Sequence, residues 1–176
     1  MTTADIRLVK PAVEYRESYI GMIAEWKASG EERTPWTLDL DPSDFPAMVE
    51  ELNGYALGIG VKPEWVPSTT RWLVDGSGRV LGAVNIRHAL NEYLREKGGH
   101  IGYGVRPSER RKGYASEMLR QALEIVRGLG IDKVLITCDK DNLGSAGTIL
   151  KNGGVLDSEG VDHGKVFQRY WIEVKG

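Results

Sequence analysis

Four residues in front of an amphipathic segment have the types and spacing to bind an anion. They are the cations Arg106, Arg110, Arg111 and Lys112, followed by Gly113, within the run GYGVRPSERRKGYASEMLRQAL. A helix dipole disfavours cations at the start of a helix, so their position there needs a reason. The first backbone N–H groups of a helix lack partners and bind phosphate, and nearby Arg and Lys side chains add charge-assisted hydrogen bonds. The pattern therefore indicates a phosphate site, against the alternative of a solvated surface turn.

The loop differs from the two best-known phosphate-binding sequences. It lacks the P-loop order of Gly, four residues and Gly-Lys-Ser/Thr, and it lacks the three glycines of the dinucleotide fingerprint. Gly113 allows a backbone conformation or a close approach that a side chain would block, and Ala115 and Ser116 are small. We therefore expect open backbone donors at this point, in a fold of another kind.

The elements around this loop predict an α/β (α+β) fold with a mixed, mostly antiparallel twisted sheet flanked by helices. The apolar pattern and turn residues predict strands at residues 6–9, 71–74, 79–90, 100–105, 133–138 and 165–174. They predict helices at 13–28, 45–55, 91–97 and 145–152, and one after Gly113 that buries Met118, Leu119, Ala122, Ile125 and Val126. Residues 1–176 are expected to form one domain.

Composition limits the classes of function. Apolar residues make up 41% of the chain, charged residues 27%, and the formal net charge is -2, so no global attraction to nucleic acid or to an anionic membrane is expected. The N-terminus lacks a signal-peptide pattern and Cys138 is the one cysteine, so we expect a cytoplasmic protein without an internal disulfide.

The residues around the loop resemble the GNAT superfamily of acyl-CoA N-acetyltransferases. The run from Arg110 to Ala115 fits the pattern Arg/Gln-x-x-Gly-x-Gly/Ala, after a strand that ends at Val105. Downstream, Cys138-Asp139, Asn142-x-x-Ser145 and Lys151-x-Gly153 are similar in order and spacing to the second block of that superfamily. The stretch from Asn85 to Tyr103 looks like a bacterial subgroup of predicted acetyltransferases.

The resemblance implies acetyl-CoA as cosubstrate and no metal. It implies that backbone groups of Tyr103, Gly104 and Val105 pair with the pantetheine arm. It implies that backbone N–H groups of Arg111, Lys112, Gly113, Tyr114, Ala115 and Ser116 hold the pyrophosphate, with Arg110 and Lys112 on the remaining phosphates. Asn142 and Ser145 are expected near the cofactor, or as ordinary caps of the following helix.

The chemistry expected is direct attack of a primary amine on the thioester, which needs a base and a proton for the leaving thiolate. Many members of the family carry a tyrosine seven residues after the Asn as the proton donor, and this chain has Ile149 there. The role passes to another residue, for which Tyr103 and Tyr170 are the candidates, or to water, or no donor is needed. His100 is the first candidate base, because its unperturbed pKa suits proton transfer, and Glu92 is the second if His100 is structural.

Asn85 and Arg87 are candidates for the acceptor pocket, since a guanidinium suits a carboxylate. Trp36 and Trp65, in irregular segments, suggest a flap over the acceptor if they are exposed. The expected partner is a small-molecule or peptide amine, with a homodimer left open and with no nucleic acid or membrane. The alternative function is a non-catalytic sensor of CoA, or a nucleic-acid-binding module, that uses the same basic loop.

Overall fold

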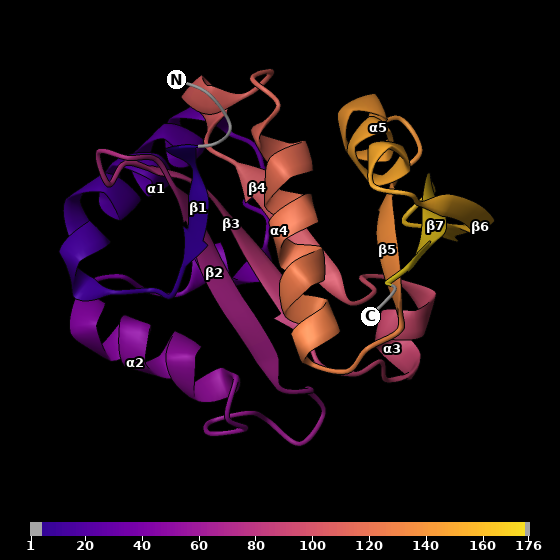
Figure 1. The fold of residues 1–176 in the computed structure, drawn as a ribbon, viewed down its shortest axis with the longest axis horizontal. Helices are drawn as coiled ribbons and strands as arrows, with labels where there is room; N and C mark the ends of the chain where they lie inside the picture. The colour runs from indigo at the N-terminus through magenta and orange to yellow at the C-terminus, as the bar shows by residue number, and fades with distance from the viewer. Residues whose placement is uncertain (1–4, 175–176) are drawn as a thin grey trace.

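The computed structural model describes residues 5–174 and contains two β-sheets with five α-helices around them (Figure 1). The first sheet has the order β1-β2-β3-β4 and is antiparallel throughout. Its strands are β1 (Arg7–Val9), β2 (Ser68–Val74), β3 (Val80–Arg87) and β4 (Ile101–Val105). The second sheet has the order β5-β7-β6, with β5 (Lys133–Asp139), β6 (Val155–Asp162) and β7 (Lys165–Glu173).

The helices cover both faces of the first sheet. They are α1 (Arg16–Ser29), α2 (Phe45–Tyr55), α3 (Glu92–Glu96), α4 (Tyr114–Gly128) and α5 (Leu143–Lys151). Met118, Leu119 and Ala122 of α4 pack with Val84 and Ile86 in one core cluster. The rings of α1 and α2 pack on Trp72 and Ala83 in a second cluster. Because side chains alternate along a strand, the two clusters lie on opposite faces of the same sheet.

Local sequence signals explain where these helices begin. Asp44 caps α2 through a hydrogen bond from the Ala47 N–H, at 3.1 Å, and Asn91 caps α3 through the Leu94 N–H, at 2.8 Å. Gly30 ends α1 in the left-handed conformation, at φ 72°. Within residues 5–174, no helix has both the length and the apolar character that a membrane crossing requires.

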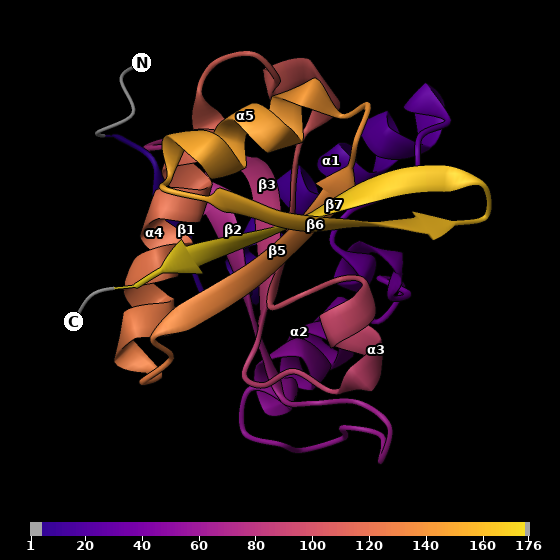
Figure 2. The same ribbon diagram turned by 90° about the vertical axis from the view of Figure 1, so that its right-hand side faces the viewer.

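The structure matches the predicted elements apart from one strand. The mixed α/β fold is confirmed, and α2 has the predicted bounds. β6 was not predicted: it forms a hairpin with β7 through a turn at His163 and Gly164, and Figure 2 shows that hairpin extending away from α5. Four of its consecutive residues, from Asp157 to Gly160, are polar or glycine, so its own pattern does not favour a strand.

The two sheets meet at one point and diverge from it. The His100 N–H donates to the Leu135 carbonyl at 2.7 Å, which joins the beginning of β4 to β5. Gly99 makes this approach possible, since a Cβ there would collide with the Leu135 carbonyl and its φ is +60°. Beyond this point no pairing between β4 and β5 exists in the described chain, and each strand presents an unpaired edge to the other.

Candidate active site

The diverging strands enclose a cleft of about 760 Å³. Its walls are β4, the turn before α4, the end of β5 and the first turn of α5, with the loop after α1 on the opposite side. The lining residues used below are Glu31, Glu32, Gly102, Tyr103, Arg110, Arg111, Gly113, Cys138, Asp139, Asn142 and Ser145.

The N-terminus of α4 opens into this cleft with free backbone donors. Gly113 is its N-cap, with φ 82°, and no side chain caps it. Arg111 also has a left-handed backbone, with φ 64°. Among the described residues, none accepts a hydrogen bond from the backbone N–H groups of residues 111–116. The donors predicted from the sequence are therefore not occupied by the protein's own groups.

The cations of this loop differ in their partners. Arg106 is buried, and it donates to Glu25 and to the carbonyls of Ser18 and Val80, so it fastens α1 to β3. Arg110 pairs with Glu31 at 2.6 Å and Lys112 pairs with Glu109 at 2.8 Å. Within residues 5–174, Arg111 has no ion-pair partner.

One edge of β4 faces the cleft. The Arg106 N–H donates to Leu81 and the His100 carbonyl accepts from Arg87, so the even-numbered residues of β4 direct their backbone groups to β3. Tyr103 and Val105 therefore direct theirs to the cleft.

The prediction for the backbone of Gly104 is corrected by this register. Gly104 lines the cleft, but its N–H and C=O point to β3. Its missing side chain has a different role, because a Cβ there would collide with the carbonyl of Thr34.

Tyr103 and Ser145 meet inside the cleft. Their hydroxyl oxygens lie 2.9 Å apart, and burial raises the pKa of Tyr103 to about 12. Asn142 accepts from the Ser145 N–H at 3.1 Å, which is the cap of α5. Ile149 is fully buried in the core, so the position that is a tyrosine in many family members does not reach the cleft.

Neither candidate base lines the cleft. His100 is buried, its Nδ1 accepts from the Leu135 N–H at 2.9 Å, and burial together with Arg87 and Arg95 lowers its pKa to about 4. Glu92 is exposed on α3. Tyr170 is buried and donates to Gln168 at 2.7 Å. The geometry gives His100 a structural contact between the sheets.

Asn85 and Arg87 also lie outside the cleft. Asn85 is fully buried, and its Nδ2 donates to Ser68 and Thr70. Arg87 lines a second, neighbouring pocket together with Trp36 and Trp65, which are half-buried.

No chemical role was predicted from the sequence for four further residues that line the cleft, although Cys138 and Asp139 were named as the end of a strand. Asp139 and Cys138 stand at the end of β5, and Glu31 and Glu32 follow α1. Because side chains alternate along β5, the Cys138 side chain lies on the same side of the strand as Tyr103, and the Asp139 side chain lies on the side of α3. Burial raises the pKa of the Cys138 thiol. In the described part of the chain, no group of three His, Cys, Asp or Glu side chains is arranged to hold a metal ion.

Two diverging strands, with bare helix donors at one end of the gap, define a protein that binds an extended anionic ligand between its sheets. The acetyltransferase (GNAT) domain family matches residues 13–155, and the chain belongs to this family. It is an acetyltransferase domain. No curated protein matches the chain.

Solved structures share the fold at low sequence identity. The microcin C7 self-immunity acetyltransferase MccE, in complex with acetyl-CoA and AMP, is 18% identical, with TM-score 0.71 over 97% of this chain and 93% of that chain. A Salmonella typhimurium acetyltransferase that modifies the N-terminal serine of a ribosomal subunit protein is 15% identical, with TM-score 0.69 over 97% and 96%. A chimera of the spermidine N-acetyltransferase SpeG from Vibrio cholerae is 14% identical, with TM-score 0.65 over 96% and 95%.

Proposed function

We propose that the protein transfers the acetyl group of acetyl-CoA to a primary amine by direct attack of the amine on the thioester. The observation that carries this proposal is the set of unpartnered backbone donors of residues 111–116, which opens into the cleft between β4 and β5. Such donors, with the helix dipole behind them, suit a diphosphate. The solved complex of a structural relative with acetyl-CoA supports the same cosubstrate.

The cleft has groups for each part of the cosubstrate. The N–H groups after Arg111 hold the pyrophosphate, and the free guanidinium of Arg111 adds a charge-assisted hydrogen bond. The edge of β4 at Tyr103 continues the sheet by pairing with the amide groups of the pantetheine arm, and the Val105 carbonyl, which accepts from Arg110 Nε at 3.2 Å, becomes available when Arg110 moves to the phosphates. Arg110 reaches the phosphates once Glu31 releases it. Asn142 and Ser145 border the arm at the start of α5.

The acceptor enters from the side of α3 and the loop after α1. A primary alkylamine has a pKa of about 10.4, so it must lose a proton before attack at neutral pH. We assign this proton to a water held by Asp139, which lines that side of the cleft. The amine nitrogen then forms a bond to the thioester carbon, and an N–H on the β4 edge stabilises the oxyanion.

Tyr103 completes the transfer. The C–S bond breaks as the tetrahedral intermediate collapses, and the departing thiolate takes the proton of the Tyr103 hydroxyl. Its pKa of about 12 keeps that hydroxyl protonated at neutral pH, so it is available as a donor. Ser145 orients the hydroxyl and connects it to solvent, from which the proton is restored.

The proposal is tested with purified protein by measuring CoA binding and thiol release with a panel of amines. Binding of CoA and release of thiol that depends on an amine support it. Tight CoA binding with no turnover would favour a sensor. Affinity for duplex DNA that falls steeply with salt would favour a nucleic-acid module. Cytoplasmic location and a homodimer stay predictions, which cell fractionation and sedimentation test.

A further inference from the structure

A second pocket lies beside the cleft and is built largely from aromatic rings. It has a volume of about 460 Å³. Trp36 lies 5.1 Å from Trp65 and 6.1 Å from Tyr55, measured between ring centroids, and Tyr55 and Trp65 meet edge to face. Because the rings pack on one another, they form a rigid wall against which a flat apolar group can stack at little entropic cost. Such a wall suits an aromatic ligand.

The floor of this pocket carries an arginine without an acidic partner. Arg87 Nη1 donates to the carbonyls of Gly98 and Gly99, at 3.1 and 3.4 Å. No Asp or Glu among residues 5–174 forms an ion pair with it, and no described residue accepts from its Nε or Nη2. Burial lowers the pKa of Arg87 to about 10. A guanidinium that has lost water and gained no carboxylate binds an anionic ligand strongly.

The same guanidinium separates the pocket from the cleft. Arg87 lines the pocket and Gly102 lines the cleft. A Cβ on Gly102 would lie 3.6 Å from both Nη1 and Nη2 of Arg87, and 3.6 Å from the Cβ of Pro35. Gly102 directly precedes Tyr103. An anion bound to Arg87 is therefore next to Gly102, and the reacting thioester is assigned to the following residue of β4, Tyr103.

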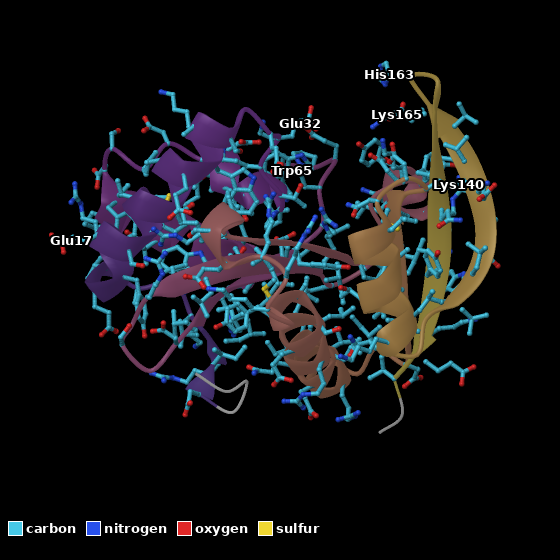
Figure 3. All side chains as sticks on the ribbon, turned by 90° about the horizontal axis from the view of Figure 1, so that it is seen from above. Glu17, Glu32, Trp65, Lys140, His163 and Lys165 are labelled. Atoms are coloured by element: carbon cyan, nitrogen blue, oxygen red, sulfur yellow. The ribbon has the colours of Figure 1, made fainter. Side chains whose placement is uncertain are left out.

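The other charges around the pocket lie at its rim. Glu64 lines the pocket, and Lys62 Nζ lies 4.7 Å from the Trp65 ring centroid. Both side chains are exposed and their charges are opposite in sign, so they offset each other. Arg87 is then the charge that a ligand inside the pocket meets. In the view of Figure 3, Trp65 of the pocket and Glu32 of the cleft are labelled next to each other.

We infer that the acceptor is an aromatic α-amino acid, with its ring against Trp36, Tyr55 and Trp65 and its carboxylate on Arg87. The α-amine, one bond from the carbon that bears the carboxylate, then points past Gly102 to the thioester. This inference rests on the proposed function and deepens it. The product is the N-acetyl amino acid. CoA leaves as the thiol with the proton of Tyr103, and the proton of the amine goes to the water held by Asp139.

The test uses L-phenylalanine, phenethylamine, L-alanine and spermidine as probes. Calorimetry measures binding to the protein saturated with CoA, and thiol release measures turnover with acetyl-CoA. Phenethylamine lacks the carboxylate and L-alanine lacks the ring, so we expect each to bind at least about tenfold more weakly than L-phenylalanine. The values of kcat/KM for the probes should fall in the same order as their affinities. Spermidine or L-alanine as the best substrate would overturn the inference and leave acetyl transfer intact.

Variants add a second readout. Arg87→Met should remove most of the preference for L-phenylalanine over phenethylamine, and Arg87→Lys should keep part of it. Arg95→Met is the matched control, because Arg95 is exposed on α3 and lines neither cavity. Trp65→Leu should reduce the preference for L-phenylalanine over L-alanine.

The two proposals fail in different ways. Binding of L-phenylalanine that depends on Arg87, without turnover, would support the pocket and contradict acetyl transfer. Turnover of amines with no preference for the ring and the carboxylate would overturn the pocket and support transfer.

Discussion

The hydroxyl of Tyr103 on β4 lies 2.9 Å from the hydroxyl of Ser145 on α5, so the two sides of the cleft are joined by a hydrogen bond between two side chains. Of the two tyrosines considered as replacements for the missing family tyrosine, Tyr103 alone lines the cleft. The contact places a protonated phenol on the side of the cleft where the cosubstrate arm is proposed to lie.

We expect Tyr103→Phe to lower kcat by about 10- to 100-fold, because general-acid catalysis is lost while the ring still packs. CoA affinity and the KM of the amine should stay within about twofold, since the phenol acts only as the thiolate leaves. Because the pKa of Tyr103 is about 12, the wild-type rate should show no loss from its ionisation up to about pH 11.

Tyr170→Phe is the control for that experiment. Tyr170 donates to Gln168 and lies outside the cleft, so its variant should keep the wild-type kcat. Equal losses in both variants would indicate damage to packing and would remove Tyr103 from the mechanism.

Gly113→Ala should weaken CoA binding by at least about tenfold, because the Cβ stands where phosphate approaches the helix donors. The left-handed backbone at φ 82° should also cost about 1 kcal/mol of unfolding free energy. No atom lies within 4 Å of the added Cβ, so packing is unchanged. Calorimetry with CoA and chemical denaturation measure the two effects.

Gly130→Ala supplies a matched control for Gly113→Ala. Gly130 has φ +76°, has equally open surroundings and follows the other end of α4. It should show the same loss of stability with unchanged CoA affinity. If both variants bind CoA as the wild type does, the turn before α4 is not the phosphate site.

His100 should make the fold sensitive to acid. Its pKa is about 4 in the folded protein, and an unfolded histidine titrates near 6.5, so the unfolded chain binds the extra proton between these values. Stability is therefore retained above about pH 6.5 and falls as the pH falls, by up to about 3 kcal/mol. Denaturation at several pH values measures this slope.

His100→Asn separates this effect from the other histidines. The Asn oxygen can accept from the Leu135 N–H, while the titrating ring is gone. The pKa of His88 is also lowered by burial, so part of the slope should remain. A slope as steep in the variant as in the wild type would show that His100 does not carry the transition.

The sequence predicted α4 and its turn well because both depend on local signals. The apolar face of α4 repeats at helical spacing, and Gly113 marks the turn by itself. β6 has no such pattern, and its strand conformation comes from pairing with β7. The role of His100 depends on its contact with Leu135, which lies 35 residues further along the chain, and a local sequence pattern cannot predict such a contact.

The second pocket could also be predicted only in part from the sequence. Arg87 was predicted to line an acceptor site, and the structure places it with Trp36, at the start of a short 3-10 helix, and Trp65, in the loop before β2. Strand alternation indicates on which face of the sheet the Arg87 side chain lies. Only the packed fold brings the rings of Trp36 and Trp65 to it.

Asp139 is the residue whose role the sequence left unassigned, and its test uses pH. Asp139→Asn should lower kcat/KM for the amine by about 100-fold at pH 7, because the water that takes the amine proton loses its partner. The deficit should shrink as the pH rises toward the amine pKa, since free amine then needs no base. Asp157→Asn, at an exposed position on β6, should match the wild type. Asp139 lies 3.7 Å from Lys165 Nζ, whereas no ion pair of Glu32 is found among residues 5–174. Glu32→Gln tests this second carboxylate of the cleft, and a larger loss there would assign the base to Glu32. A deficit in Asp139→Asn that stays constant from pH 7 to pH 9 would mean that Asp139 positions the substrate and does not remove its proton.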